Sequence, residues 1–274
     1  MDAALPERVS VVPVRTPTLP PATHTNTWIL GAGDLVVVDP ASPWDDERAR
    51  LHAELRRRLD GGERVSALFL THHHHDHVSG AVDLRERLRA DGVDVPLLAH
   101  PLTADLLRRT VPVDRLVHDG DAVLDGVIAV HTPGHAPGHL CLAGDGWVVA
   151  GDMVAGVGTI VIDPGEGDLQ DYLDSLQRLR ELGAELLLPA HGPALPGADT
   201  VLAMYQAHRH QRTVQIGDAL ERLGAATALD VAPLVYPELD PNLYPLAATQ
   251  ITSHLLFLER HGRARREGER WRRA

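Results

Sequence analysis

A short cluster of histidine and aspartate residues is the part of this sequence that points most directly to chemistry. Residues 71–77 read THHHHDH, which places His72, His74, Asp76 and His77 in one arc. Imidazole nitrogens and carboxylate oxygens are ligands that zinc and similar divalent ions accept. Because alternate residues of an extended loop face the same way, we expect His72 and His74 to share one point. Asp76 and His77 are expected to face a second point, so one loop could serve two neighbouring metal ions.

Three later segments each supply one further candidate ligand. They read HTPGHAPGH, AGD and PAHG, and each follows a run of apolar residues that is typical of a buried strand. Loops that converge at the ends of strands are where α/β and sandwich folds commonly build their sites. The candidate ligands in these segments are His135, Asp152 and His191.

With these four fragments in this order, the chain resembles the metallo-β-lactamase superfamily. Residues 25–30 and 35–39 are similar to the opening hairpin and aspartate loop of that family. Residues 151–179 and 205–212 resemble one branch, the lactamase-beta-2-like hydrolases, in which a small winged-helix-like domain follows the sandwich. The resemblance implies an α/β fold, a four-layer αββα sandwich with a small, mostly helical C-terminal domain.

Carried over position by position, the resemblance implies a zinc-dependent hydrolase with two Zn²⁺ per chain and a metal-bridging hydroxide as nucleophile. The expected catalytic carboxylates are Asp76 and Asp152. The expected ligands form two sets of three that share one bridging carboxylate. They are His72, His74 and His135 for the first ion, Asp76, His77 and His191 for the second, and Asp152 for both.

Other polar residues are given different roles. His73 and His75 alternate with the ligands, so they are expected to point away from the ions, and Cys141 lies in an apolar run typical of the core. His208 and Arg209 lie on a long predicted helix and could clamp an anionic substrate, because a guanidinium group matches phosphate or carboxylate. A surface helix with ordinary polar residues explains the same pattern.

The elements that must position these residues can be predicted from periodicity. Buried strands are expected at 67–70, 127–130, 147–150 and 186–188, each directly before a ligand segment. Amphipathic helices are expected at 45–59, 81–90, 102–109, 169–182, 201–223, 225–231 and 246–262. The segment GPALPGAD is rich in proline and glycine and marks a boundary. We therefore predict a metallo-β-lactamase domain over residues 1–198 and a winged-helix-like domain over residues 199–274.

Composition limits the remaining choices. The chain has 274 residues, 44% of them apolar, which can bury a sizeable core, and its single cysteine excludes an intramolecular disulfide. No run approaches the ~20 apolar residues of a membrane span, and no signal-peptide pattern opens the chain, so we expect a cytoplasmic protein without membrane contact. The net charge of −12 argues against binding to double-stranded DNA.

The substrate is left open between two classes. A single-stranded RNA is the leading candidate, as for relatives in the branch, and a small ester or thioester is the alternative, as in glyoxalase-II-like enzymes with a similar THHHxDH motif. A third reading is a persulfide dioxygenase that binds one iron through His72, His135 and Asp152. The arginine-rich residues 259–274 could bind RNA, with Trp271 stacking on bases, but a solvated terminus is favoured. The C-terminal helices could also form a homodimer contact.

Overall fold

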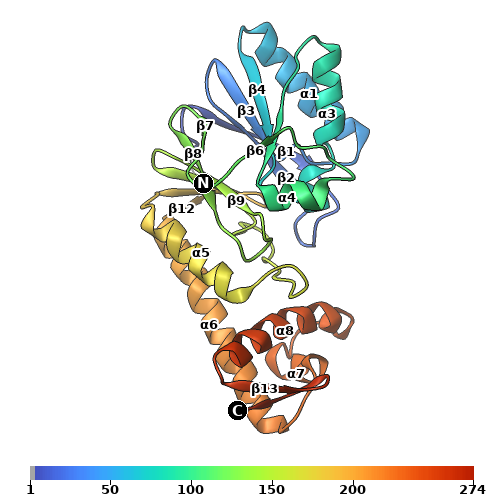
Figure 1. Cartoon of the computed structure of the whole chain (residues 1–274), viewed down its shortest axis with the longest axis vertical. Coiled ribbons are helices and arrows are strands. Elements are labelled where there is room, and N and C mark those ends of the chain that lie inside the picture. The colour runs from blue at the N-terminus through green and yellow to red at the C-terminus, as the bar shows by residue number, and fades with distance from the viewer. Residues whose placement is uncertain (1–3) are drawn as a thin grey trace.

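The computed structural model describes residues 4–274, and its larger part is built on two stacked sheets (Figure 1). The first sheet has six strands among these residues. Their spatial order is β1 (Val9–Arg15), β2 (His24–Leu30), β3 (Asp34–Val38), β4 (Arg64–Phe69), β5 (Leu97–Ala99) and β6 (Arg115–Leu116). Strands β1 to β3 pair antiparallel, and β3 to β6 pair parallel.

The second sheet also has six strands within residues 4–274. Their spatial order is β12 (Leu195–Pro196), β11 (Leu186–Pro189), β10 (Trp147–Gly151), β9 (Leu140–Gly144), β8 (Val127–His131) and β7 (Ala122–Leu124). Strands β10 and β11 run parallel, and the other pairs are antiparallel. Trp28 and Phe69 of the first sheet and Leu142 and Leu188 of the second belong to one buried cluster, which lies between the sheets.

Helices cover the outer face of each sheet. Leu51 of α1 (Asp45–Asp60) and Leu84 of α3 (Ala81–Ala90) are buried against the first sheet, in a cluster that includes Leu68. On the other side, Tyr172 of α5 (Leu169–Glu181) packs in a cluster with Val148 of β10. The remaining helices of this part are α2 (His75–Val78) and α4 (Pro101–Leu107). The expected four-layer αββα sandwich is confirmed.

A small C-terminal unit follows, and helix α6 (Ala198–Leu223) runs into it from the sandwich (Figure 1). Leu202 at one end of α6 packs with the outer face of the second sheet, whereas Leu220 near the other end packs in the core of the small unit. The rest of the unit consists of α7 (Ala228–Val235), η1 (Pro241–Leu243), α8 (Tyr244–Arg260), β13 (Ala264–Glu267) and β14 (Arg270–Arg273). The boundary predicted at residue 198 falls at the first turn of α6 and stays a prediction.

The arginine-rich end differs from the favoured expectation of a solvated terminus. Strands β13 and β14 pair antiparallel as a hairpin, and the Trp271 side chain is only 3% exposed within the core of the small unit. Burial of the indole anchors the hairpin, and it removes Trp271 as a surface on which a nucleic-acid base could stack. None of the helices within residues 4–274 is long and apolar enough to cross a lipid bilayer.

Candidate metal centre

The loop that carries the histidine cluster leaves the buried strand β4, as expected, but only its first half is extended. Residues 75–78 form the short helix α2. Asp76 and His77 lie at neighbouring positions of this helical turn, and both side chains reach the same second group of ligand atoms. His75, at the first position of this turn, is exposed. The alternation holds for His72 and His74, whose side chains meet.

One group of ligand atoms brings together His72, His74, His135 and Asp152, all within 4.8 Å of one another. His74 Nδ1 lies 2.9 Å from His72 Nε2 and 3.0 Å from His135 Nε2, and the two Nε2 atoms lie 3.3 Å apart. Nitrogen atoms bound to one tetrahedral zinc ion are about 3.3 Å apart, because each Zn–N bond is about 2.0–2.1 Å. The three imidazoles are therefore arranged as metal ligands are.

A second group contains Asp76, His77 and His191. His191 Nε2 lies 3.6 Å from Asp76 Oδ2 and 3.4 Å from Asp152 Oδ1, and His77 Nε2 lies 3.5 Å from the same Oδ1 atom. The other carboxylate oxygen, Asp152 Oδ2, lies 3.5 Å from His135 Nε2 in the first group. Asp152 thus directs one oxygen towards each group, which is the arrangement a bridging ligand needs.

The outward-facing nitrogen of each imidazole has a partner that fixes the orientation of the ring. His77 Nδ1 donates to Asp39 Oδ2 at 2.8 Å, His135 Nδ1 to the Val161 carbonyl at 2.7 Å, and His191 Nδ1 to the His24 carbonyl at 3.0 Å. His72 Nδ1 lies 3.0 Å from Thr71 Oγ1, and His74 Nε2 lies 2.6 Å from Glu166 Oε1. Partners of this kind select the tautomer whose free nitrogen faces a metal.

Two further side chains support the ligands from behind. Asp39 accepts hydrogen bonds from the Thr71 amide at 2.8 Å and the Thr71 hydroxyl at 2.7 Å, in addition to the bond from His77. His139 Nε2 accepts a hydrogen bond from the Asp152 amide at 3.1 Å, so it holds the backbone of the bridging residue. The sequence motif suggested an aspartate loop at Asp39, but it gave a supporting role to neither Asp39 nor His139.

Glu166 was not predicted from the sequence. It lies in the loop before α5, and its carboxylate contacts His73 Nε2 at 2.7 Å as well as His74. Burial acts to raise the pKa of Glu166, but the hydrogen bonds from His73 and His74 outweigh it and leave the pKa well below its usual range. His73 thus points away from the two ligand groups, towards Glu166. An isolated glutamate in a glycine-rich loop carries no pattern that would reveal this contact.

The neutral state of His135 and the unpaired atoms of the cluster fit bound metal ions. Burial lowers the pKa of His135 to about 4, so this imidazole is neutral at neutral pH, as a metal ligand must be. Burial acts to raise the pKa of Asp152, but the nearby imidazoles of His77 and His191 hold it well below its usual value. His77 Nε2 and Asp152 Oδ1 are buried without a hydrogen-bond partner among residues 4–274, and coordination to a bound cation would satisfy both atoms.

A cavity of about 240 Å³ opens onto the two groups. Its ionisable lining residues are five candidate ligands and two further acids, Asp163 and Glu166, and the rest of the lining consists of five apolar side chains, two threonines and a glycine. Leu19 and Val157 line it and are 47% and 38% exposed. None of its lining residues, all within the described part of the chain, is arginine. The cavity therefore suits a reacting group with an apolar neighbour better than a polyanion.

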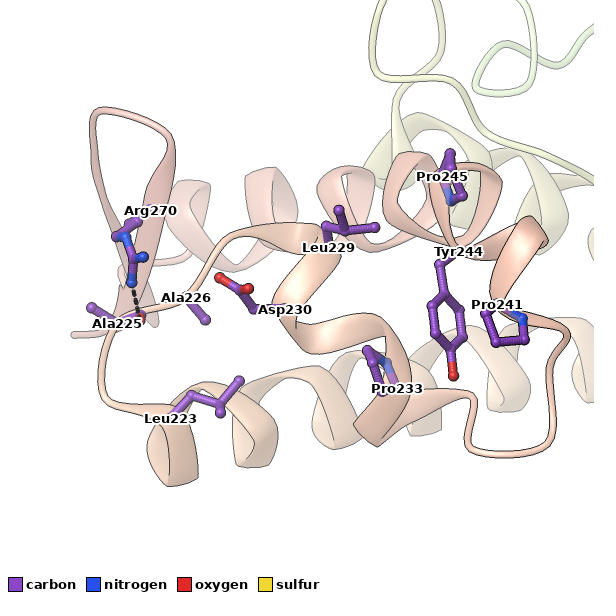
Figure 2. A pocket seen from close by; sticks show the side chains of 10 residues that line it. All are labelled: Leu223, Ala225, Ala226, Leu229, Asp230, Pro233, Pro241, Tyr244, Pro245 and Arg270. Atoms are coloured by element: carbon purple, nitrogen blue, oxygen red, sulfur yellow. Dashed lines mark hydrogen bonds between the residues drawn. The ribbon is translucent and has the colours of Figure 1, made fainter.

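A larger groove of about 740 Å³ lies in the C-terminal unit, between α7 and the start of α8 (Figure 2). Apolar side chains such as Leu229 and Pro245 line most of it. Its two charged side chains already have partners, because Asp230 caps the start of α7 and Arg270 donates to the Ala225 carbonyl. This groove contains no histidine or cysteine among its lining residues in the described chain, so it lacks the chemistry of the metal centre.

The predicted substrate clamp lies outside the cavity lining. His208 is on an exposed face of α6, whereas Arg209 is only 5% exposed. Arg209 donates to the Ile160 carbonyl at 2.6 Å and to Gln250 Oε1 at 3.1 Å, and its guanidinium group lies over the Tyr172 ring. The guanidinium group of Arg209 is therefore already bound to other residues of this chain. Contact between Arg209 and a substrate stays a prediction.

Comparison with known proteins agrees with this geometry. A family model described as metallo-beta-lactamase superfamily matches residues 20–191, and one described as beta-lactamase associated winged helix domain matches residues 227–271. A beta-lactamase-like protein 2 homolog of Drosophila melanogaster is 30% identical over 257 residues, which cover 88% of this chain and 84% of the relative.

Two further similarities concern activity and shape. An atrochrysone carboxyl ACP thioesterase of Aspergillus fumigatus is 30% identical over 245 residues, which cover 80% of this chain and 70% of the relative. The crystal structure of a beta-lactamase domain protein from Burkholderia ambifaria superposes with a TM-score of 0.83 at 24% identity, and covers 100% of this chain and 93% of that one.

Proposed function

The chain belongs to the metallo-beta-lactamase superfamily and is a metallo-hydrolase, and we propose that it hydrolyses acyl thioesters at a pair of zinc ions. The observation that carries the proposal is the cavity above the ligand cluster, which places apolar side chains such as Leu19, Val157 and Val161 beside histidine and aspartate side chains. A thioester presents a neutral carbonyl beside an apolar acyl group, and this combination matches the lining. The similarity to an ACP thioesterase supports the same class.

The proposed ligands are divided as the geometry divides them. His72, His74 and His135 would hold one ion and Asp76, His77 and His191 the other, with Asp152 between them. When bound, the ions would polarise the substrate carbonyl and make a bound water acidic enough to attack it. The protein supplies orientation through the partners of each imidazole. It also shields His72 and His77 from solvent, because both are fully buried.

Cleavage of single-stranded RNA is the second candidate, and the arginine-rich hairpin β13–β14 favours it. Arg266 and Arg270 are exposed and could contact phosphates, although each already donates to a backbone carbonyl, that of Gly268 and that of Ala225 respectively. Several others are already paired, since Arg272 lies 2.7 Å from Glu267 and Arg273 contacts Glu221. The hairpin lies on the side of the C-terminal unit away from the sandwich in Figure 1. For these reasons we place RNA second.

The test compares both substrate classes on one zinc-loaded sample. Acyl-coenzyme A and S-acyl-N-acetylcysteamine thioesters with short, long and aromatic acyl groups would be assayed beside a single-stranded RNA, at low and at physiological salt. We expect thioester turnover that changes little with salt, and its loss in Asp152→Ala. If the protein does not turn over thioesters but cleaves RNA at a rate that falls steeply with salt, it is a nuclease and the proposed function is wrong.

A matched pair of variants tests whether the cavity binds the acyl group. Leu19→Asp places a charge on the cavity wall, whereas Leu116→Asp does so at a leucine of similar exposure, 47% against 51%, on the edge strand β6. Leu19→Asp is expected to raise KM for long and aromatic thioesters about tenfold, because the cavity loses apolar contact. Leu116→Asp should leave KM unchanged. Equal effects of the two substitutions would contradict acyl binding at this wall.

A further inference from the structure

The segment of residues 157–168 runs from the metal centre to α5 and contacts two of the candidate ligands. The Val161 carbonyl accepts the hydrogen bond from His135 Nδ1, and the Glu166 carboxylate contacts His74 Nε2. We call this segment the strap. Its contacts differ in kind, because one partner is a backbone carbonyl and the other is a side chain that substitution can remove.

His74 faces the first ligand group through a different nitrogen from its neighbours. His72 and His135 present Nε2, whereas His74 presents Nδ1, at 2.9 and 3.0 Å from those two atoms. For His74 to offer a lone pair at Nδ1, the proton of the neutral ring must be on Nε2. That proton needs an acceptor, and Glu166 Oε1 lies 2.6 Å from Nε2.

We propose that Glu166 is a positioning residue that holds His74 in the Nδ1-ligating tautomer and orientation, and that it sets the affinity of the first metal ion. This inference rests on the proposed metal centre and adds to its seven ligands a side chain that positions one of them. A carboxylate behind a ligating histidine fixes the ring and increases its basicity, and removal of such a partner typically costs about 10–100-fold in metal affinity.

The strap is held firmly enough for this role. Near its tip, the Gly165 amide donates to Asp163 Oδ1 at 2.7 Å and the Glu166 amide donates to the Asp163 carbonyl at 3.1 Å. Gly167 permits a close approach to the sandwich, since a Cβ atom there would lie 2.4 Å from the Gly134 carbonyl oxygen. The position of Glu166 is therefore fixed by its own turn.

The C-terminal unit holds the same strap from the other side. Ser253 Oγ of α8 donates to the Ile162 carbonyl at 2.6 Å, and Gln250 of α8 donates to the same oxygen at 3.2 Å. Arg209 of α6 donates to the Ile160 carbonyl. Through the strap, the small unit supports His135 and His74 without contributing a ligand of its own.

A third metal site is the main alternative, because His73, His74 and Glu166 also place ligand atoms within 4.8 Å of one another. The distances argue against it. Glu166 oxygens lie 2.6 and 2.7 Å from the two Nε2 atoms, as directly hydrogen-bonded atoms do. These separations are well below the ~3.3 Å between two atoms bound to one zinc ion, whereas the nitrogen atoms of the first ligand group are 2.9–3.3 Å apart.

The experiment measures zinc binding in full-length protein by competition with a chromophoric chelator, for the parent, Glu166→Ala, Glu166→Gln and the control Glu181→Gln. Glu181 is an acid of α5 that contacts Gln177, away from the cluster. In Glu166→Ala we expect the affinity for one of two zinc equivalents to fall about 10–100-fold. Glu166→Gln should recover part of the loss, because its amide oxygen still accepts from His74, and Glu181→Gln should match the parent.

A spectroscopic measurement separates positioning from a general structural effect. The ¹⁵N shifts of the His74 ring report which nitrogen carries the proton, and we expect the Nε2–H form in the parent and a mixture of tautomers in Glu166→Ala. If Glu166→Ala loses hydrolysis but binds zinc as tightly as the parent, Glu166 contacts the substrate and the proposal is overturned. If the parent binds three zinc equivalents and Glu166→Ala only two, Glu166 is itself a metal ligand. A parent that binds two zinc ions but leaves thioesters intact would refute the proposed substrate and not this role.

Discussion

Asp39 Oδ2 and His77 Nδ1 form a hydrogen bond of 2.8 Å between two side chains that are almost fully buried. Asp39 also accepts two bonds from Thr71, so removal of its carboxylate leaves three buried donors without a partner. We predict that Asp39→Ala lowers the free energy of unfolding of the metal-free protein by about 3 kcal/mol or more, since each such donor costs about 1–3 kcal/mol. Urea denaturation measures this.

The control for that prediction is Asp34→Ala. Asp34 forms an exposed ion pair with Arg64 at 2.8 Å, and exposed pairs contribute little to stability. If Asp39→Ala lowers the free energy of unfolding no more than Asp34→Ala does, the buried network around His77 does not stabilise the fold.

The second prediction concerns the bridging carboxylate. Asp152→Ala is expected to reduce thioester hydrolysis by at least about 10³-fold and to lower zinc content, because one side chain serves both ligand groups. His75→Ala, at an exposed position of the same loop region, should retain most activity. Elemental analysis and initial rates would be measured on the same samples. Comparable losses in the two variants would contradict the assignment of the bridge.

The number and kind of metal ions form the third prediction. The seven candidate side chains exceed what one tetrahedral ion needs, so purified protein should carry close to two zinc equivalents. Removal of zinc by a chelator should lower Tm, and added zinc should restore it. One iron and no zinc would instead support the persulfide dioxygenase reading.

The fourth prediction concerns the link between α6 and the strap. Arg209→Ala removes bonds to Ile160 and Gln250 and the packing over Tyr172. We expect the free energy of unfolding to fall by about 2–4 kcal/mol, because hydrogen bonds to a buried charge contribute about 1.5–3 kcal/mol. Arg222→Ala, an exposed position farther along α6, is the control and should change it by less than about 0.5 kcal/mol. If the two variants have similar free energies of unfolding, Arg209 does not connect α6 to the segment that carries Ile160.

Acid stability is the fifth prediction and depends on His254 of α8. Its ring is 1% exposed and lies 2.8 Å from Thr213 Oγ1, and burial together with the charges of Arg209 and Arg212 lowers its pKa from 6.5 to about 3. Between these two values the unfolded chain binds a proton that the folded chain does not, so stability falls as the pH drops from 6.5 to about 3.

The measurement for His254 compares the parent with His254→Leu by urea denaturation across this pH range. The variant lacks the titrating group, so its stability should fall less steeply, by up to about 1.4 kcal/mol per pH unit. Parallel curves for the two proteins would show that His254 does not control acid stability.

Sequence reasoning succeeded where the signal is local. The four longer helices of the sandwich and the four ligand-bearing strands were predicted within a few residues, because apolar periodicity and the motif residues are contiguous in the chain. It did not predict the short helix at residues 75–78 in the second half of THHHHDH. It also missed β13 and β14, whose buried apolar residues are only Ala264 and Trp271 among arginines.

The remaining gaps are contacts between distant parts of the chain. Glu166 meets His74 across 92 positions, and Arg209 meets Ile160 across 49. Such pairs depend on how the two sheets and the C-terminal unit pack, and a single sequence does not encode them as a pattern. A polar residue in a loop or on a helix therefore reads as ordinary surface until its partners are known.

The division of ligands between the two sheets has a consequence for the order of assembly. The first sheet delivers the cluster 72–77, and the second delivers His135, Asp152 and His191, so neither half of the sandwich holds a complete set. Tight metal binding must then follow the docking of the two halves, because only the docked halves bring all the ligands together. Docking closes long chain loops and therefore costs conformational entropy before any metal is bound. Captured metal ions would oppose the reverse step, because the halves could not separate without breaking coordination bonds. Loaded protein should accordingly unfold far more slowly than metal-free protein, even where their folding rates agree.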